Sequence, residues 1–196
     1  MFILASGSPR RKELLQQINA QFEIRISTAE ELAGDGISPA VMVEKNAAAK
    51  AKAVSRLYPN QAVLGADTVV SLDGHTYGKP GSREEAIRML KAFSGRVHQV
   101  FTGIAWVYND HLFTDVVRTD VEFASLADTE IERYVRSGEP MDKAGAYAIQ
   151  GAAAEFIVGI HGSYSNVVGL PLNATVRLAR KAGVNMYGGY GEGFTP

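Results

Sequence analysis

Two adjacent arginines near the N-terminus are the first residues whose position indicates chemistry. Arg10 and Arg11 follow the segment Ser6–Pro9, which combines a tight Ser-Gly turn, a helix N-cap and a proline suited to the first helical position. A helix N-terminus already carries partial positive charge, so a cation there costs roughly 0.3–1 kcal/mol. A bound phosphate removes this conflict, because backbone N–H groups, the helix dipole and both guanidinium groups can point at it. The alternative is a solvated basic turn, but Arg11 shares the apolar face of the helix, which favours phosphate binding.

A single carboxylate interrupts the otherwise apolar segment Ala62–Leu72. Apolar residues on both faces are typical of a central strand, and a carboxylate buried there needs a charged partner. Asp67 is therefore the candidate catalytic residue. The alternative is an aspartate that only accepts hydrogen bonds from neighbouring turn N–H groups. Gly65 leaves room for another group to approach the same strand.

Two lysines are candidates for further phosphate contacts. Lys50 lies on the apolar face of the long helix expected from Ser38-Pro39 to about Tyr58, where an unpaired ammonium is costly. It either extends to the surface or meets an anion, and the residues alone leave both alternatives open. Lys79 lies in a glycine-containing turn that superficially resembles a P-loop. That turn has one residue too few between its glycines, and a proline replaces the required Ser or Thr.

Acidic residues gather in the polar loop over residues 27–37. The loop contains Glu30, Glu31 and Asp35. Carboxylates in such a loop are usually solvated, and the functional alternative is that one of them binds a phosphate-bound divalent cation.

Farther along the chain, Gln150 lies between an isoleucine and a glycine, so we expect a partly enclosed side-chain amide.

Alternating strand and helix patterns carry these residues and predict a single α/β domain with a long sheet flanked by helices. Hairpin signals at Asp73-Gly74 and at 109–111 make the expected sheet mixed rather than purely parallel. Helix N-caps are expected at Ser8, Ser38, Ser82 and Asp128, and the last helix should begin at Pro171. Strands are expected over 2–5, 22–26, 62–72, 96–108, 112–123 and 156–160, and a loop over 162–168.

Composition excludes several classes of protein. With 20 Lys and Arg against 21 Asp and Glu, the net charge of −1 provides no general attraction for nucleic acid or an anionic membrane. The absence of cysteine excludes thiolate catalysis, disulfides and cysteine-type zinc sites. The four histidines do not occur at helical spacings typical of zinc ligands. Neither a membrane span nor a secretory leader is indicated, so we expect a cytoplasmic protein.

Several segments together resemble the Maf family of nucleoside triphosphate pyrophosphatases. The resemblance extends to about Lys181 and implies two lobes around a cleft, as in inosine triphosphate pyrophosphatases. We expect one catalytic domain over 1–184. The glycine-rich residues 185–196 follow no strand pattern and open no helix pattern, so we expect them to form a flexible tail. The matching segments are Ser6–Arg11 with Glu13–Leu15, the Gly-Ala-Asp-Thr segment at 65–68, Lys79-Pro80 and the segment 142–151.

The resemblance implies a role for each candidate residue. Asp67 corresponds to the family's proton acceptor, and the residues leave open whether it orients or deprotonates the water or helps to hold the metal. Glu31 corresponds to an acidic position that we assign to metal binding. Thr68 corresponds to a specificity position, and the 7-methyl-GTP subgroup carries an acidic residue where this chain has Gln150. The residues expected to bind substrate are Ser6, Arg10, Arg11, Lys50, Thr68, Lys79 and Gln150.

The implied reaction is hydrolysis of dTTP and UTP between the α- and β-phosphates, giving the monophosphate and pyrophosphate. The implied cofactor is a divalent cation, Mg²⁺ with Mn²⁺ as the alternative. Two other functions stay open: a nucleotide-binding regulator without turnover, and a pyrophosphatase for modified nucleotides such as 7-methyl-GTP. We expect no nucleic-acid or membrane partner, and a homodimer is left open.

Overall fold

Three long neighbouring strands form the centre of the protein, which we describe from a computed structural model covering residues 1–34 and 36–188. They are β3 (Val63–Leu72), β5 (Val97–Tyr108) and β6 (His111–Phe123), each antiparallel to the next. Asn109 and Asp110 join β5 to β6 with φ values of 49° and 62°. A two-residue hairpin turn needs positive φ at both residues, because this conformation matches the twist of the two strands. The long hairpin predicted from the sequence is therefore confirmed.

Shorter strands complete a seven-stranded mixed sheet in the order β2-β1-β3-β5-β6-β7, with β4 also paired to β3. The parallel strands β1 (Phe2–Leu4) and β2 (Phe22–Ile24) lie at one side, and β7 (Ile157–His161) lies at the other. β4 (His75–Tyr77) folds back on β3 through the predicted Asp73-Gly74 turn. This arrangement confirms the predicted mixed α/β fold.

One edge of β3 is interrupted, and this interruption positions the site. β5 pairs with β3 continuously from Val63 to Ser71. On the opposite edge, β1 pairs only at Val63 and Leu64, and β4 pairs only from Val70 to Leu72. Among the described residues, positions 65–69 therefore have no strand partner on that edge, and three of them, Asp67, Thr68 and Val69, line a cleft.

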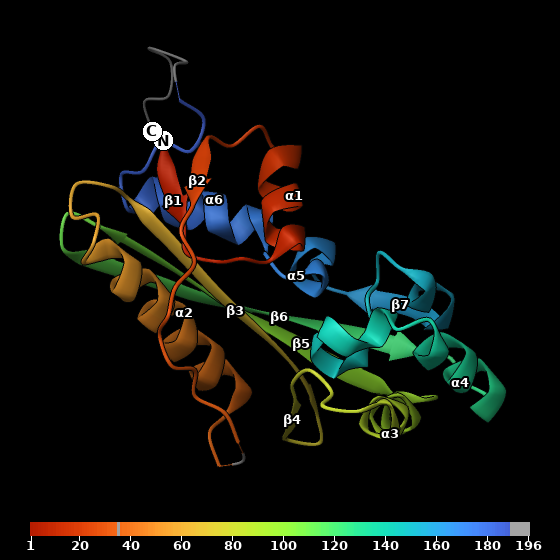
Figure 1. Cartoon of the computed structure of the whole chain (residues 1–196). Helices are drawn as coiled ribbons and strands as arrows, with labels where there is room; N and C mark the ends of the chain where they lie inside the picture. Colours follow the sequence, from red (N-terminus) through yellow and green to blue (C-terminus); the bar gives the residue numbers. More distant parts are fainter. Residues whose placement is uncertain (35, 189–196) are drawn as a thin grey trace.

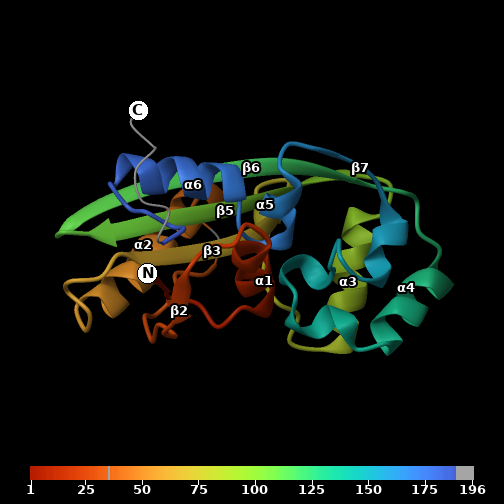
Figure 2. The ribbon, with the colours of Figure 1, turned by 90° about the horizontal axis from the view of Figure 1, so that it is seen from above.

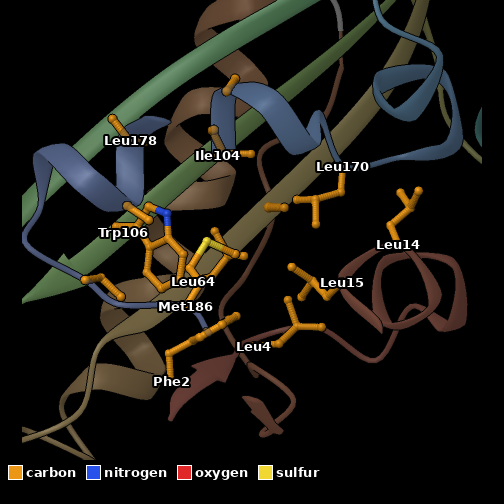
Figure 3. Close-up of a cluster of buried hydrophobic side chains, with 14 of the residues drawn as sticks. Phe2, Leu4, Leu14, Leu15, Leu64, Ile104, Trp106, Leu170, Leu178 and Met186 are labelled. Atoms are coloured by element: carbon orange, nitrogen blue, oxygen red, sulfur yellow. The ribbon is translucent and has the colours of Figure 1, made fainter. Parts of the chain in front are cut away.

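The helices form two cores at the two ends of the long strands (Figures 1 and 2). α1 (Pro9–Gln17) and α6 (Leu172–Lys181) pack at the end that holds β1, where Trp106 Nε1 donates a hydrogen bond of 3.2 Å to the Thr175 carbonyl. α3 (Arg83–Phe93) and α4 (Asp128–Arg136) pack at the other end. Figure 3 shows the first core, whose labelled members are Phe2, Leu4, Leu14, Leu15, Leu64, Ile104, Trp106, Leu170, Leu178 and Met186.

α2 (Pro39–Ser55) covers the opposite face of the sheet from α6 (Figure 1). Two strand glycines allow its backbone to lie directly on the sheet. A Cβ at Gly65 would lie 2.2 Å from the Ala47 carbonyl oxygen, and a Cβ at Gly103 would lie 2.3 Å from the Val43 carbonyl oxygen. The sequence predicted that another group approaches Gly65, and this group is the backbone of α2. The close contact brings the inward side chains of α2 to β3.

Two local predictions were wrong or incomplete. The expected loop at 162–168 contains the short helix α5 (Tyr164–Val168), because the Ser163 side chain accepts the Asn166 N–H at 3.3 Å as an N-cap. Asp128 is the first residue of α4 rather than its N-cap, which is Ala127. Met186, near the start of the tail expected over 185–196, is 2% exposed within the first core.

The remaining part of the expected tail, residues 189–196, and Asp35 of the acidic loop lie outside the described residues. Three 3₁₀ turns, η1 (Glu139–Asp142), η2 (Ala144–Ala146) and η3 (Ala152–Phe156), carry the chain from α4 to β7. In the described part of the chain, no helix is long and apolar enough to cross a membrane.

Candidate active site

A cleft of about 840 Å³ opens at the interrupted edge of β3, between the two cores. It is formed by the turn before α1, the acidic loop, one side of α2, the middle of β3, the turn after β4 and the segment 142–150. The structure brings to this cleft all nine residues predicted from the sequence: Ser6, Arg10, Arg11, Glu31, Lys50, Asp67, Thr68, Lys79 and Gln150.

Asp67 is buried and has the charged partner that the sequence predicted for it. This residue is 6% exposed, and its Oδ1 accepts a hydrogen bond of 2.7 Å from Lys50 Nζ. Lys50 therefore does not extend to the surface, and its side chain is 12% exposed. We expected this lysine to contact phosphate, whereas the structure pairs its ammonium with a carboxylate. The pairing places one positive charge beside Asp67 before any ligand arrives.

Glu31 approaches the same ammonium from the acidic loop. Its Oε1 lies 2.8 Å from Lys50 Nζ, so oxygens of Glu31 and Asp67 converge on the ammonium of Lys50. Two hard carboxylate ligands with space for phosphate oxygens are the donor set that Mg²⁺ or Mn²⁺ takes in nucleotide enzymes. The residues present therefore fit a divalent cation. Within residues 1–34 and 36–188, no group of three or more His, Asp or Glu side chains forms a metal cage.

Asn46 is a site residue that the sequence analysis missed. It is 2% exposed on α2, and its Nδ2 donates hydrogen bonds of 2.9 Å to Asp67 Oδ2 and 3.0 Å to the Leu32 carbonyl. Its Oδ1 accepts the Leu32 N–H at 2.7 Å. Asn46 thus fixes both the buried carboxylate and the loop that carries Glu31. The available signal was its spacing, because residues 46 and 50 lie on the same face of a helix.

Arg11 extends inward as predicted, but its guanidinium is already engaged by protein acceptors. Nε donates to the Gly169 carbonyl at 2.9 Å, and the two terminal nitrogens donate to Ser6 Oγ at 3.0 Å and Thr68 Oγ1 at 3.1 Å. Burial lowers the pKa of Arg11 from its ordinary value, while the nearby Asp67 carboxylate opposes this change. Arg11 therefore supports Thr68 and the turn at Ser6. These bonds use three of the five N–H donors of the guanidinium, and its contact with phosphate stays a prediction.

The other predicted groups are more open to solvent. Arg10 lies 3.8 Å from Asp142 Oδ2, and its side chain is 26% exposed. Asp142 also accepts a hydrogen bond from Lys143, and this contact lowers the pKa of the Asp142 carboxyl. Lys79 is exposed in the turn after β4. Gln150 is exposed as well, so the expectation of a partly enclosed amide was wrong. The turn that contains Gln150 follows the 3₁₀ turn η2 and lines the cleft.

The protein is an α/β protein with an open mixed sheet, and its cleft combines cationic side chains from several elements with a buried carboxylate, an arrangement suited to an anionic ligand. The family described as Maf-like protein matches residues 1–182, and the chain belongs to this family. The predicted resemblance is therefore confirmed.

Two relatives cover nearly the whole chain, and both are named dTTP/UTP pyrophosphatase. The relative from Symbiobacterium thermophilum is 50% identical over 187 residues, which are 95% of this chain and 96% of the relative. The relative from Pelotomaculum thermopropionicum is 47% identical over 186 residues, 94% and 97% of the two chains. Among solved structures, the Staphylococcus aureus Ham1 protein covers 92% of this chain and 98% of its own, at 15% identity and a TM-score of 0.51. That likeness concerns the fold alone.

Proposed function

We propose that this protein hydrolyses nucleoside triphosphates, with dTTP and UTP preferred, between the α- and β-phosphates. The observation that carries the proposal is the buried Asp67, held by Lys50 and Asn46 at the floor of a cleft ringed by cationic side chains. A protein that only bound nucleotides would need the cations but not this carboxylate. The relatives named dTTP/UTP pyrophosphatase support nucleoside triphosphate hydrolysis by this chain.

The cations of the cleft match the charge of the substrate. A triphosphate brings close to four negative charges, and the half-buried Arg10 and the exposed Lys79 present cationic groups to it. The N–H groups of the first turn of α1 add donors at the same side of the cleft. These groups orient the chain of phosphates along the interrupted edge of β3, with the α-phosphorus toward Asp67.

Asp67 then acts on the attacking water. Its carboxylate orients the water and accepts a proton as the water oxygen bonds to phosphorus, while the bond to the departing pyrophosphate oxygen breaks. The products are a nucleoside monophosphate and pyrophosphate. Asn46 holds Oδ2 of Asp67 so that Oδ1 stays directed toward Lys50 and the cleft.

Glu31 and Asp67 are the residues that would hold the divalent cation, Mg²⁺ or Mn²⁺. When bound, the cation neutralises phosphate charge and makes the phosphorus easier to attack. The ammonium of Lys50 provides one positive charge between the same two carboxylates.

Gln150 and Thr68 are assigned to recognition of the base. A side-chain amide can accept a hydrogen bond from the N3–H of uracil or thymine and donate one to O4. The same amide could pair with cytosine after a rotation, so selectivity requires that its orientation be fixed. Thr68, held by Arg11 and Thr102, lies in the same cleft. We further assign the reaction to the cytoplasm, without a nucleic-acid partner.

The test is a panel of dTTP, UTP, CTP, GTP and 7-methyl-GTP with Mg²⁺ and with Mn²⁺. Pyrophosphate and orthophosphate are measured separately for each substrate. We expect pyrophosphate as the product and the highest kcat/KM for dTTP and UTP. Orthophosphate alone would contradict cleavage between the α- and β-phosphates. Binding without turnover would identify a regulator, and a preference for 7-methyl-GTP would identify an enzyme for modified nucleotides.

A further inference from the structure

The turn that carries Gln150 is held at both ends by side chains that lie outside the cleft. The Gly151 N–H donates to the Ala148 carbonyl at 3.0 Å, which closes a turn with Gln150 at its third position. At the start of this turn, the Ala148 N–H donates to the hydroxyl oxygen of Tyr134 at 3.3 Å. Just beyond its end, the Ala152 N–H donates to Glu139 Oε2 at 3.2 Å.

Tyr134 and Glu139 are themselves joined, so the two attachments form one unit. The Tyr134 hydroxyl donates to Glu139 Oε1 at 2.9 Å. Burial, together with this hydrogen bond, raises the pKa of Tyr134, so the hydroxyl keeps its proton and continues to donate at neutral pH. Each oxygen of the Glu139 carboxylate therefore has a defined partner, and a swing of the turn would break hydrogen bonds at both ends.

Gly151 adds a steric constraint to the same unit. A Cβ at this position would lie 2.0 Å from Glu139 Oε1, so the carboxylate packs directly against the backbone of the turn. Tyr134 is itself held by packing. It is 3% exposed, and its ring packs edge-on against Phe156 with ring centroids 5.3 Å apart. Because Ile131 and Val135 are also buried, α4 remains packed when a single hydroxyl is removed.

We infer that Tyr134 and Glu139 are positioning residues that determine base selectivity by fixing the turn that presents Gln150. Neither side chain is part of the cleft lining, so each acts on the base only through this turn. The inference rests on the proposed function, in which the amide of Gln150 reads the base. The proposed function requires a fixed orientation of the Gln150 amide, and Tyr134 and Glu139 provide it. An exposed amide discriminates uracil from cytosine only when its backbone is held in one place.

The experiment measures kcat and KM for UTP and CTP in five variants and the unmodified protein. Tyr134→Phe removes one hydroxyl and keeps the packed ring. Glu139→Gln keeps the shape but has one acceptor oxygen for two donors. Gln150→Ala defines the loss of base reading. Tyr58→Phe and Glu155→Gln are matched controls away from the cleft. The first removes the hydrogen bond that Arg25 donates to Tyr58, and the second removes the charge of the ion pair with Arg133.

We expect the unmodified protein to prefer UTP and Gln150→Ala to lose that preference. Tyr134→Phe and Glu139→Gln should each lower the UTP-to-CTP ratio of kcat/KM by about tenfold, since a small displacement of a positioning group has effects of this size or larger. The change should appear as a higher KM for UTP, with kcat within about twofold. The two control variants should keep the original ratio.

Three outcomes overturn the inference in distinguishable ways. If Gln150→Ala loses the preference while folded Tyr134→Phe or Glu139→Gln keeps it, the positioning role is wrong and the proposed function stands. An equal loss for both substrates together with a lower Tm also contradicts the positioning role, because it marks a purely structural one. If the unmodified protein does not prefer UTP over CTP, base reading by Gln150 fails, and the positioning role fails with it.

Discussion

The side-chain amide of Asn46 and the carboxylate of Asp67 are joined by a buried hydrogen bond of 2.9 Å across the contact between α2 and β3. The same amide binds both the N–H and the carbonyl of Leu32. One side chain therefore sets the distance between the floor of the cleft and the loop of Glu31. This relationship depends on Gly65, since α2 could not lie so close to the sheet if this position carried a Cβ.

Replacement of Asn46 by alanine should reduce turnover more than stability. The variant leaves Asp67 Oδ2 without its donor and releases the loop at Leu32. Loss of a partner that orients a reacting group costs roughly 10–100-fold in metal affinity or activity. We expect such a loss in kcat/KM for UTP, with weaker binding of Mn²⁺ measured by calorimetry. The control is Asn173→Ala on the exposed side of α6. Unchanged kinetics in Asn46→Ala would contradict the positioning role.

Asp67→Asn should nearly abolish turnover while the protein still folds and binds nucleotide. The substitution keeps the size of the side chain but removes the proton acceptor and the charge that faces Lys50. General acid–base groups contribute roughly 10²–10⁴-fold, so kcat should fall within that range. Steady-state kinetics and a binding titration measure the two effects. The matched control is Asp120→Asn, whose carboxylate pairs with Arg118 on β6. A variant at position 67 that keeps more than about a tenth of the rate would show that Asp67 is not the base.

The two arginines of α1 should respond differently to replacement by lysine. Arg10 acts as a point charge, so Arg10→Ala should raise KM for UTP and Arg10→Lys should restore it. Arg11 spans three acceptors on three different segments, and an ammonium cannot reproduce this planar arrangement. We expect both Arg11→Ala and Arg11→Lys to lose activity and about 1–3 kcal/mol of unfolding free energy. Denaturant titration alongside kinetics provides the measurement. Full rescue by Arg11→Lys would argue against the described hydrogen bonds.

His98 should make the protein less stable in mild acid. It is fully buried, with Nε2 2.9 Å from the Tyr147 hydroxyl, and burial lowers its pKa from 6.5 to about 4. Between these values the unfolded chain binds a proton that the folded chain does not, so stability falls as pH falls from 6.5 to 4. The loss from this group reaches about 3 kcal/mol, at about 1.4 kcal/mol per pKa unit.

The measurement compares unfolding free energies at pH 4.5 and pH 7. His98→Gln cannot titrate, so its stability should change less between the two pH values than that of the unmodified protein. His111→Gln, at the exposed hairpin after β5, is the matched control and should keep the original pH dependence. Equal pH dependence of His98→Gln and the unmodified protein would remove His98 as the cause.

The sequence predicted most of the fold and of the site because both left local signals. A lone carboxylate in an apolar strand identified Asp67, and an inward lysine on the long helix identified Lys50. The pairing of these two residues was not predicted, because we expected Lys50 to contact phosphate. Asn46 gave no comparable signal, because a buried amide looks like any polar residue until its acceptors are known. The commitment of Arg11 to Gly169 was equally hidden, since it joins residues 158 positions apart. The short helix α5 was missed because a serine N-cap followed by only five helical residues is a weak pattern.

That link between Arg11 and Gly169 also bears on how the enzyme is made. The first strand and the first helix of the chain emerge from the ribosome long before the carbonyl that Arg11 binds. Contacts between distant residues form late, because a large loop must close before they contribute. A fragment that ends before Gly169 lacks the carbonyl that Arg11 binds, so the cleft is complete only when nearly the whole chain has been translated.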